Sequence, residues 1–216
     1  MKSLVIFDLD GTLLNTIEDL GNSVNYALAQ MGYPTHAIAA YPAMVGNGVM
    51  RLVERALPAE VRTPAIVDRM LEHFREHYDH HCTDCTAPYP GIPELLADLT
   101  ERGINLAVTS NKYQAAVTKI IRHFFPDANW KAVLGNTPGV PRKPDPSIVF
   151  EALNQCPTPK AEVLYVGDSG IDIETARRAC VASVGVTWGF RPERELRQAY
   201  ADHVISDPDY ILSLLS

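Results

Sequence analysis

Apolar and polar residues follow two different patterns along the chain, and the change between them divides the sequence. Residues 3–7 form a short apolar run that is typical of a buried strand. From about residue 15 to residue 88, apolar residues recur at helical spacing, as in Ile17, Leu20 and Val24, and no strand pattern is found. These stripes predict the core-facing sides of a small helical bundle.

Strand and helix patterns alternate after the Pro- and Gly-rich segment Thr86–Pro93. The expected strands are Asn105–Thr109, Lys131–Leu134, Glu162–Val166, Ser183–Val186 and His203–Ile205. The expected helices lie near Pro93–Arg102, Tyr113–Phe124, Pro146–Leu153, Ile171–Ala179 and Glu193–Tyr200. Such alternation indicates a parallel sheet that is covered by helices on both faces, and the strand at residues 3–7 is expected to join it.

The fold class predicted by these patterns is α/β, with a doubly wound parallel-sheet core and an inserted all-helical domain. We expect residues 1–14 and 89–216 to form the core and residues 15–88 to form the helical insertion. A chain of 216 residues is long enough for this arrangement.

Composition and charge indicate which partners and which cellular compartment to expect for the protein. The formal net charge is −7 and no basic block is present, which argues against nucleic acid or an anionic membrane surface as a partner. No apolar segment approaches the length of a bilayer span, and the first apolar run stops at Asp8, too early for a signal peptide. Four cysteines are too few for a disulfide scaffold, so we expect a reduced, cytoplasmic protein.

Polar residues gather where the expected strands end. Because the carboxyl ends of parallel strands meet at one edge of the sheet, these side chains are expected to lie together. Asp8 and Asp10 follow the first strand, and Lys143 lies in a loop that can reach the same edge. The other strand-end residues are Thr109, Ser110, Asn111, Lys112, Gly167, Asp168, Ser169 and Asp172. Acids placed this close repel one another unless a cation joins them, and oxygen ligands with substrate phosphate suit Mg²⁺.

Four segments resemble, in order, the motifs of the haloacid dehalogenase superfamily. They are "FDLDGTLLNT", "LAVTSNK", "RKPDP" and "YVGDSGIDIETA". Within that superfamily the chain is similar to the phosphatases with a helical cap, and "VGNGVMRLVERAL" looks most like the phosphoglycolate phosphatases. The resemblance covers nearly all residues and implies a Rossmann-like core, a helical cap over residues 15–88, and Mg²⁺-dependent hydrolysis of a phosphomonoester through an aspartyl-phosphate. The implied substrate is 2-phosphoglycolate.

The resemblance also assigns roles to the strand-end residues. Asp8 matches the nucleophile and a metal ligand, and Asp10 matches the general acid/base, whose backbone carbonyl would be a second ligand. Asp168 matches another metal ligand, and Asp172 matches the acid that holds a metal-bound water or the lysine. Lys143 matches the cation that offsets charge on Asp8 and on the transferring phosphoryl group.

Further residues would bind the substrate. Ser110 and the backbone amide of Asn111 match groups that hold a phosphoryl oxygen. Gly11 and Thr12 match the turn that aims backbone amides at the phosphate. The "GNG" segment of the cap, Gly46, Asn47 and Gly48, corresponds to the specificity loop of family members, and Arg51 just after it is expected to meet a substrate carboxylate.

Other substrates of the same core, and another class of protein, are alternatives to this interpretation. Pyrophosphate, a nucleoside monophosphate or a sugar phosphate are alternative substrates for the same core, and a phospho-Asp signalling or binding protein is an alternative from another class. Relatives that cleave carbon–halogen bonds lack an acid at the position of Asp10. Phosphonoacetaldehyde hydrolases and sugar-phosphate mutases use a cap lysine, whereas no lysine occurs between Thr12 and Asn111. We expect a small phosphorylated metabolite as partner, and a monomer or homodimer.

Two further features call for an interpretation. The segment "HYDHHCTDC" at residues 77–85 could suggest a zinc or redox site, but a second pair of ligands is missing and a polar helix end is favoured. Relatives often have Gly where this chain has Cys180 and Tyr200, each near an expected helix end, where glycine would suit a positive φ.

Overall fold

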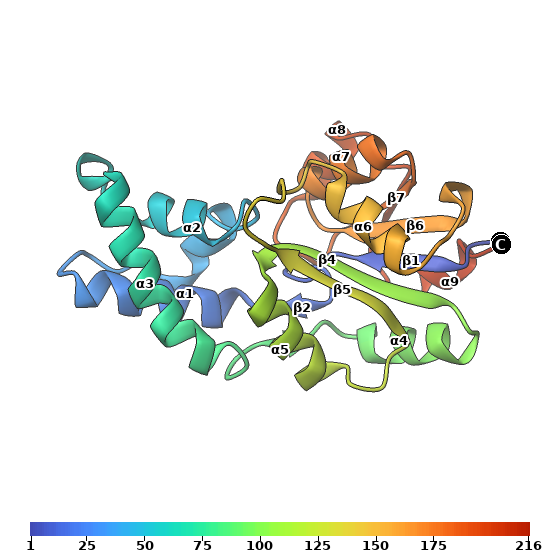
Figure 1. The fold of residues 1–216 in the computed structure, drawn as a ribbon, viewed down its shortest axis with the longest axis horizontal. Coiled ribbons are helices and arrows are strands. Elements are labelled where there is room, and N and C mark those ends of the chain that lie inside the picture. Colours follow the sequence, from blue (N-terminus) through green and yellow to red (C-terminus); the bar gives the residue numbers. More distant parts are fainter.

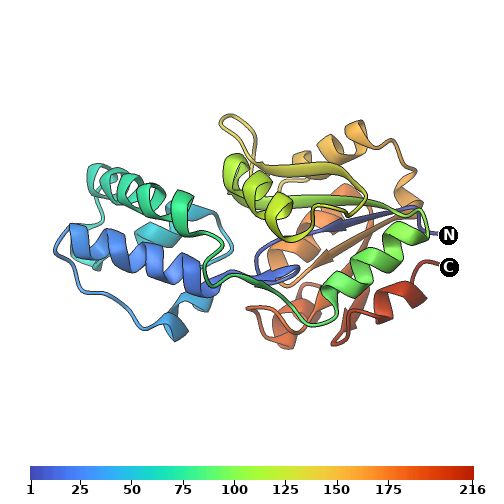
Figure 2. The same ribbon diagram turned by 90° about the horizontal axis from the view of Figure 1, so that it is seen from below.

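A six-stranded parallel sheet forms the centre of the computed structural model, which describes residues 1–216 (Figures 1 and 2). The strand order is β5-β4-β1-β6-β7-β8, and every neighbouring pair is parallel. The strands are β1 (Leu4–Phe7), β4 (Asn105–Tyr113), β5 (Trp130–Asn136), β6 (Val163–Gly167), β7 (Ala182–Val186) and β8 (His203–Ile205). The chain moves outward from β1 in both directions, so the end of β1 lies where the order of strands switches direction.

Helices cover both faces of this sheet. They are α4 (Ile92–Glu101), α5 (Gln114–Phe124), α6 (Ser147–Gln155), α7 (Gly170–Ala179), α8 (Glu193–Gln198) and α9 (Tyr210–Ser213), with a 3₁₀ turn, η3 (Lys160–Glu162), before β6. Successive side chains of β1 point to opposite faces: Leu4 and Ile6 pack with apolar residues of α6 and α7, while Val5 and Phe7 pack with those of α4, α5 and α9. The predicted parallel sheet with two covered faces is confirmed.

Residues 17–81 form a separate group of helices beside the sheet (Figure 1). They are α1 (Ile17–Gln30), η1 (Ile38–Ala43), α2 (Val49–Ala56), η2 (Ala59–Val61) and α3 (Pro64–His81). The predicted apolar stripes are the packed faces: Leu20 and Val24 of α1 and Met70 and Phe74 of α3 are all buried. α3 begins where the Thr63 side chain accepts a hydrogen bond from the Ile66 amide.

The chain enters and leaves these helices through two short strands that lie side by side. β2 (Leu14–Asn15) pairs antiparallel with β3 (Ala87–Pro88), although the sequence shows no strand pattern at either place. The buried carboxylate of Asp19, near the start of α1, accepts hydrogen bonds from the amides of Cys85 and Thr86. We propose that the division between core (1–14 and 89–216) and cap (15–88) runs through this strand pair.

Two helix ends adopt a left-handed backbone without glycine. φ is 58° at Cys180, which follows α7, and 63° at Tyr200, which follows α8. The positive φ that was expected to suit glycine at these two positions is present, although the residues are Cys and Tyr. A side chain in this conformation carries a steric cost.

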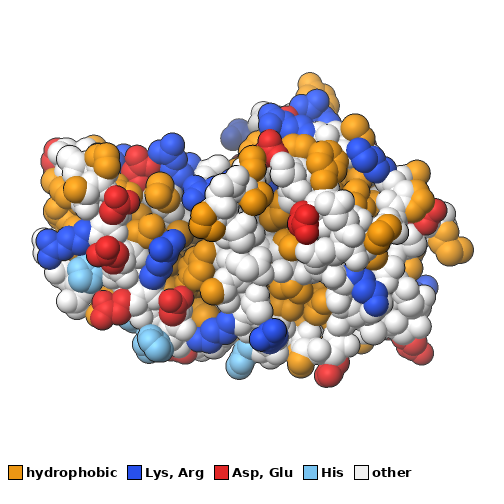
Figure 3. All heavy atoms as spheres, viewed as in Figure 1, with side chains coloured by type: hydrophobic (Ala, Val, Ile, Leu, Met, Phe, Trp, Pro, Cys, Tyr) orange, Lys and Arg blue, Asp and Glu red, His pale blue; other side chains and the backbone are white.

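The face of the molecule drawn in Figure 3 shows no single dominant charge. On the face drawn in Figure 3, basic and acidic side chains are interspersed over both the helical cap and the sheet domain. None of the helices is both long and apolar enough to cross a membrane.

Candidate active site

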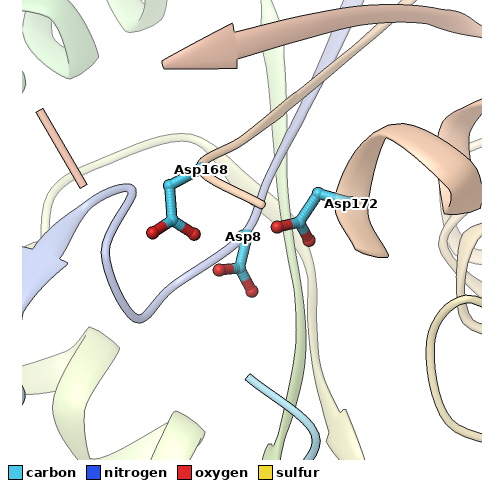
Figure 4. Close-up of side chains that lie close together, drawn as sticks. All are labelled: Asp8, Asp168 and Asp172. Carbon is cyan, nitrogen blue, oxygen red and sulfur yellow. The ribbon is translucent and has the colours of Figure 1, made fainter. Parts of the chain in front are cut away.

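Three buried carboxylates meet at the carboxyl ends of β1 and β6 (Figure 4). Asp8 directly follows β1, Asp168 directly follows β6, and Asp172 lies in the first turn of α7. One oxygen from each of the three lies within 4.8 Å of the others. Among His, Cys, Asp and Glu side chains, three ligand atoms come this close together only here. The sequence predicted that these three acids would meet at this edge, and they do.

Lys143 lies between two of these acids. Its Nζ donates to Oδ1 of Asp8 at 2.6 Å and to Oδ1 of Asp172 at 2.7 Å. It also donates to the Thr109 carbonyl at 3.0 Å, so the ammonium is held from several sides. Lys143 comes from the loop between β5 and α6, more than a hundred residues after Asp8. The fold therefore brings the predicted lysine to the predicted acids.

Local backbone features fix the acids in place. Gly11 has a φ of +89°, and a Cβ at that position would lie 2.3 Å from Oδ2 of Asp168, so only glycine allows this approach. Asp168 accepts a hydrogen bond from the Phe190 amide at 2.7 Å. Ser169 caps α7, and its hydroxyl donates to Oδ2 of Asp172 at 2.5 Å. Both oxygens of Asp172 are thus engaged, one by Lys143 and one by Ser169.

The electrostatics of the cluster favour an additional cation. Burial raises the pKa of Asp8 from its ordinary 3.8 to about 7, with Lys143 opposing the shift and Asp172 adding to it. Burial also raises the pKa of Asp168 well above its ordinary value, and the charges of Asp172 and Asp8 raise it further. Burial alone would lower the pKa of Lys143, but Asp172 and Asp8 raise it well above its ordinary value. One ammonium does not offset three carboxylates, and the donor atoms are all oxygens, which suits Mg²⁺.

Asp10 lies beside a second lysine that the sequence analysis did not single out. Lys112 Nζ is 2.9 Å from Oδ1 of Asp10, and the Thr16 hydroxyl donates to the same oxygen at 2.6 Å. Lys112 also donates to the Tyr78 hydroxyl of α3 at 2.9 Å. The only signal in the sequence is its place directly after Asn111, at the strand end.

A cavity of about 60 Å³ lies between the helical cap and the sheet domain, directly above the acids. Its walls include nine of the predicted site residues: Asp8, Asp10, Gly46, Gly48, Ser110, Asn111, Lys143, Asp168 and Asp172. Four predicted residues do not line it: Gly11, Thr12, Asn47 and Arg51. The cap contributes mainly apolar side chains. Two further wall residues are cationic: Lys112, a strand-end residue to which the sequence gave no role, and Arg191, which sequence reasoning missed.

Two of the predicted cap residues, Arg51 and Asn47, do not line the cavity because their side chains make other contacts. The side chain of Arg51 is 60% exposed and pairs with Glu54 at 2.5 Å, so its guanidinium lies on the surface of α2. Asn47 accepts a hydrogen bond from Arg55 at 2.6 Å. Helical spacing gave the position of Arg51 along the chain but not the direction of its side chain, and that direction leads away from the cavity.

Asn111 and Arg191 connect the cap loop to the sheet domain. The Asn111 side chain donates to the Gly46 carbonyl at 3.1 Å and accepts from the Lys143 amide at 2.9 Å. Arg191, in the loop after β7, donates to the Val45 carbonyl at 2.6 Å. The bonds to the Gly46 and Val45 carbonyls join the segment around the "GNG" loop to residues near the acids, so they hold the cap loop against the cavity.

Thr12 is placed close to the site but behind its wall. Its side chain is fully buried and Oγ1 has no hydrogen-bond partner, while its carbonyl accepts from the Trp188 indole at 3.0 Å. The two cysteines of the 77–85 segment differ in exposure: Cys82 is buried in the cap and Cys85 is exposed.

Comparisons with known proteins agree with this geometry. The model of the haloacid dehalogenase-like hydrolase family matches residues 5–186. Phosphoglycolate phosphatase of Mesorhizobium japonicum is 33% identical over 210 residues, which cover 96% of this chain and 92% of that protein. Phosphoglycolate phosphatase of Haemophilus influenzae is 33% identical over 218 residues, covering 98% and 97%. A crystal structure from Lactobacillus delbrueckii subsp. bulgaricus, provisionally named as a phosphoglycolate phosphatase, superimposes with a TM-score of 0.92 at 33% identity, covering 100% and 99% of the two chains.

Proposed function

The chain belongs to the haloacid dehalogenase-like hydrolases and is a hydrolase of phosphate esters; from this premise we propose that it hydrolyses 2-phosphoglycolate to glycolate and phosphate. The proposal includes Mg²⁺ as the cofactor and a phosphorylated aspartate as the intermediate. The observation that carries it is the setting of Asp8: a buried carboxylate, held through Oδ1 by Lys143, in the wall of a small cavity between the cap and the sheet domain.

Asp8 is suited to attack phosphorus. The 2.6 Å bond from Lys143 orients the carboxylate, and Oδ2 accepts no hydrogen bond from the protein. In the proposed first step, an oxygen of Asp8 bonds to phosphorus while the bond from phosphorus to the ester oxygen breaks. Lys143 offsets the negative charge of the attacking group and of the phosphoryl oxygens.

Asp10 is placed to move the proton. In the first step its carboxyl gives a proton to the ester oxygen, so that glycolate leaves as an alcohol rather than an alkoxide. In the second step the resulting carboxylate takes a proton from water, whose oxygen attacks phosphorus and displaces Asp8. Phosphate is released, and both aspartates return to their starting states.

The metal would be held by Asp8, Asp168 and the backbone carbonyl of Asp10. The fit rests on the oxygen-only donor set and on the raised pKa values of Asp8 and Asp168, which burial causes and the neighbouring carboxylates increase. Bound Mg²⁺ supplies positive charge beside the phosphoryl group. Asp172 would act through Lys143, which it holds at 2.7 Å.

A small substrate is favoured by the size of the cavity. Its volume of about 60 Å³ is well below the roughly 300–1,000 Å³ typical of pockets for drug-sized ligands. A two-carbon phosphate suits a cavity of this size better than a nucleotide or a sugar phosphate, which would require the cap to move away.

The test combines two variants with two substrates. Asp8→Asn should abolish Mg²⁺-dependent hydrolysis of both 2-phosphoglycolate and p-nitrophenyl phosphate, while Asp98→Asn, an exposed position on α4, should match the wild type. Asp10→Asn with p-nitrophenyl phosphate, whose leaving group needs no proton, should accumulate a phosphoryl group on the Asp8 peptide, detected by mass spectrometry. Wild-type activity in Asp8→Asn would exclude the mechanism. A substrate panel in which another small phosphate is strongly preferred would exclude 2-phosphoglycolate.

A further inference from the structure

Lys112 is a buried cation in the cavity wall to which the proposed reaction gives no role. It lies at the end of β4 and its side chain is 5% exposed. Its ammonium has two side-chain partners: an ion pair with Oδ1 of Asp10 at 2.9 Å and a hydrogen bond to the Tyr78 hydroxyl at 2.9 Å. The ammonium also lies 4.8 Å from the centre of the Tyr78 ring. An ammonium has three donor hydrogens, so these two partners leave one for a ligand.

The other two cations of the cavity wall are already engaged. Lys143 is enclosed by Asp8, Asp172 and the Thr109 carbonyl. Arg191 keeps free N–H donors, but it donates to the Val45 carbonyl at 2.6 Å and lies 3.9 Å from Glu195, so its guanidinium is held at the cap loop and not beside Asp10. Lys112 is therefore the cation that is best placed to bind a further anionic group.

The cap cannot supply that charge. Its contribution to the cavity wall consists of glycines, apolar side chains and one hydroxyl: Leu20, Val45, Gly46, Gly48, Val49, Leu52, Phe74 and Tyr78. Among apolar walls an anionic group of a ligand loses its hydration, and only a direct partner compensates for this. Recognition of a charged substrate must then come from the sheet domain, on the side of Asp10.

We propose that Lys112 binds a second anionic group of the substrate and thereby selects phosphate monoesters of small hydroxy acids. This inference rests on the proposed function and names the residue that reads the carboxylate. Asp10 must reach the ester oxygen at about 3 Å to deliver its proton, and Lys112 Nζ is 2.9 Å from Asp10. Lys112 thus lies within about 6 Å of the ester oxygen. A carboxylate one carbon away from that oxygen spans this distance.

Tyr78 links this recognition to the cap. Its hydroxyl belongs to α3 and reaches Lys112 only because the cap rests on the sheet domain. The cap thus contributes a hydroxyl and a dry apolar wall, while the charge that selects the substrate stays on the rigid strand end. This division explains how a cap without any charged residue in the cavity wall can cover a site for a charged acid.

The test measures discrimination between two substrates of similar size. 2-Phosphoglycolate and ethyl phosphate differ in that a carboxylate replaces a methyl group. Lys112→Met should reduce the ratio of their kcat/KM values by about tenfold to hundredfold, the range expected for one hydrogen bond to a charged group. Lys112→Gln, which keeps a donor without the charge, should reduce it less. Lys131→Met, at an exposed position of β5, should leave the ratio unchanged.

Equal losses on both substrates would overturn the inference, because they would mean that Lys112 acts on Asp10 and not on the carboxylate. Binding measurements with the inactive Asp8→Asn variant test the role of Lys112 independently of the proposed hydrolysis. There, titration calorimetry should show preference for 2-phosphoglycolate over ethyl phosphate, and Asp8→Asn/Lys112→Met should lose the preference. Wild-type protein that fails to hydrolyse 2-phosphoglycolate would refute the proposed function alone. The role of Lys112 would be refuted if Asp8→Asn/Lys112→Met still bound 2-phosphoglycolate more tightly than ethyl phosphate. This outcome counts if the double variant unfolds at the same temperature as Asp8→Asn.

Discussion

The buried acids should make the metal-free protein less stable as the pH rises. Asp8 has a pKa of about 7 in the folded chain, against an ordinary value of 3.8 that we assign to the unfolded chain. Between these two values the folded state binds a proton that the unfolded state has released, so the free energy of unfolding falls with increasing pH. A difference of about three units corresponds to about 4 kcal/mol over this window. The raised pKa of Asp168 acts in the same direction.

Urea unfolding followed by circular dichroism would measure this effect. With a chelator present, the midpoint should be lower at about pH 7.5 than at about pH 5. Excess Mg²⁺ should raise the midpoint at the higher pH, because a ligand that binds only the folded state stabilises it by mass action. Asp8→Asn in chelator should show a shallower pH dependence. Wild-type stability that stays flat or rises over this window, or an equally steep slope in Asp8→Asn, would refute the reasoning.

Three further predictions concern single residues. Lys143→Met should lower kcat by about a hundredfold or more in steady-state kinetics. It should also lower the free energy of unfolding, measured in urea, by about 3–5 kcal/mol above pH 7, because the buried carboxylates lose their counter-charge. Cys180→Gly and Tyr200→Gly should each raise the free energy of unfolding by about 0.5–1 kcal/mol in thermal unfolding, whereas Gly32→Ala, at a φ of +74°, should lower it by a similar amount. Arg51→Ala should change KM for 2-phosphoglycolate less than about twofold, as expected for a surface ion pair; a rise specific to that substrate would restore a role for this arginine.

The elements of the sheet domain could be predicted because each has a strong local pattern. The apolar runs of β1 and β6 are buried on both faces, and such strands are apolar throughout. The boundaries were less accurate: β4 was expected to end at Thr109 and ends at Tyr113. Residues 110–112 are polar, and polarity alone does not distinguish the end of a strand from a strand that enters a site.

The strand pair β2–β3 could not be predicted from local pattern. Each strand has two residues, and they come together only because the helices between them close the loop. No periodicity exists in two residues, so neither segment carries a strand signal by itself. The same limit applies to Asp19, whose hydrogen bonds to residues 85 and 86 bridge a long stretch of chain.

The acids of the site could be predicted from the sequence because the carboxyl ends of parallel strands lie at one edge of the sheet. Lys143 could be included through its motif, although its contacts with Asp8 and Asp172 depend on the fold. Lys112 was not singled out, since its position matters only once the cap places Tyr78 above it. Arg51 shows the opposite problem: it has suitable chemistry near a suitable loop, but its side chain pairs with Glu54 on the outside.

For the sheet domain, β2 and β3 are the two sides of a hairpin, and the whole group of helices is its loop. The entropy lost when a loop closes grows only with the logarithm of its length, so a long insertion costs the sheet little more than a short one. Lys143 and the three acids hold one another without any bond from the cap. What covers the acids is therefore exchangeable, and a change in substrate need not disturb the residues that carry out the chemistry.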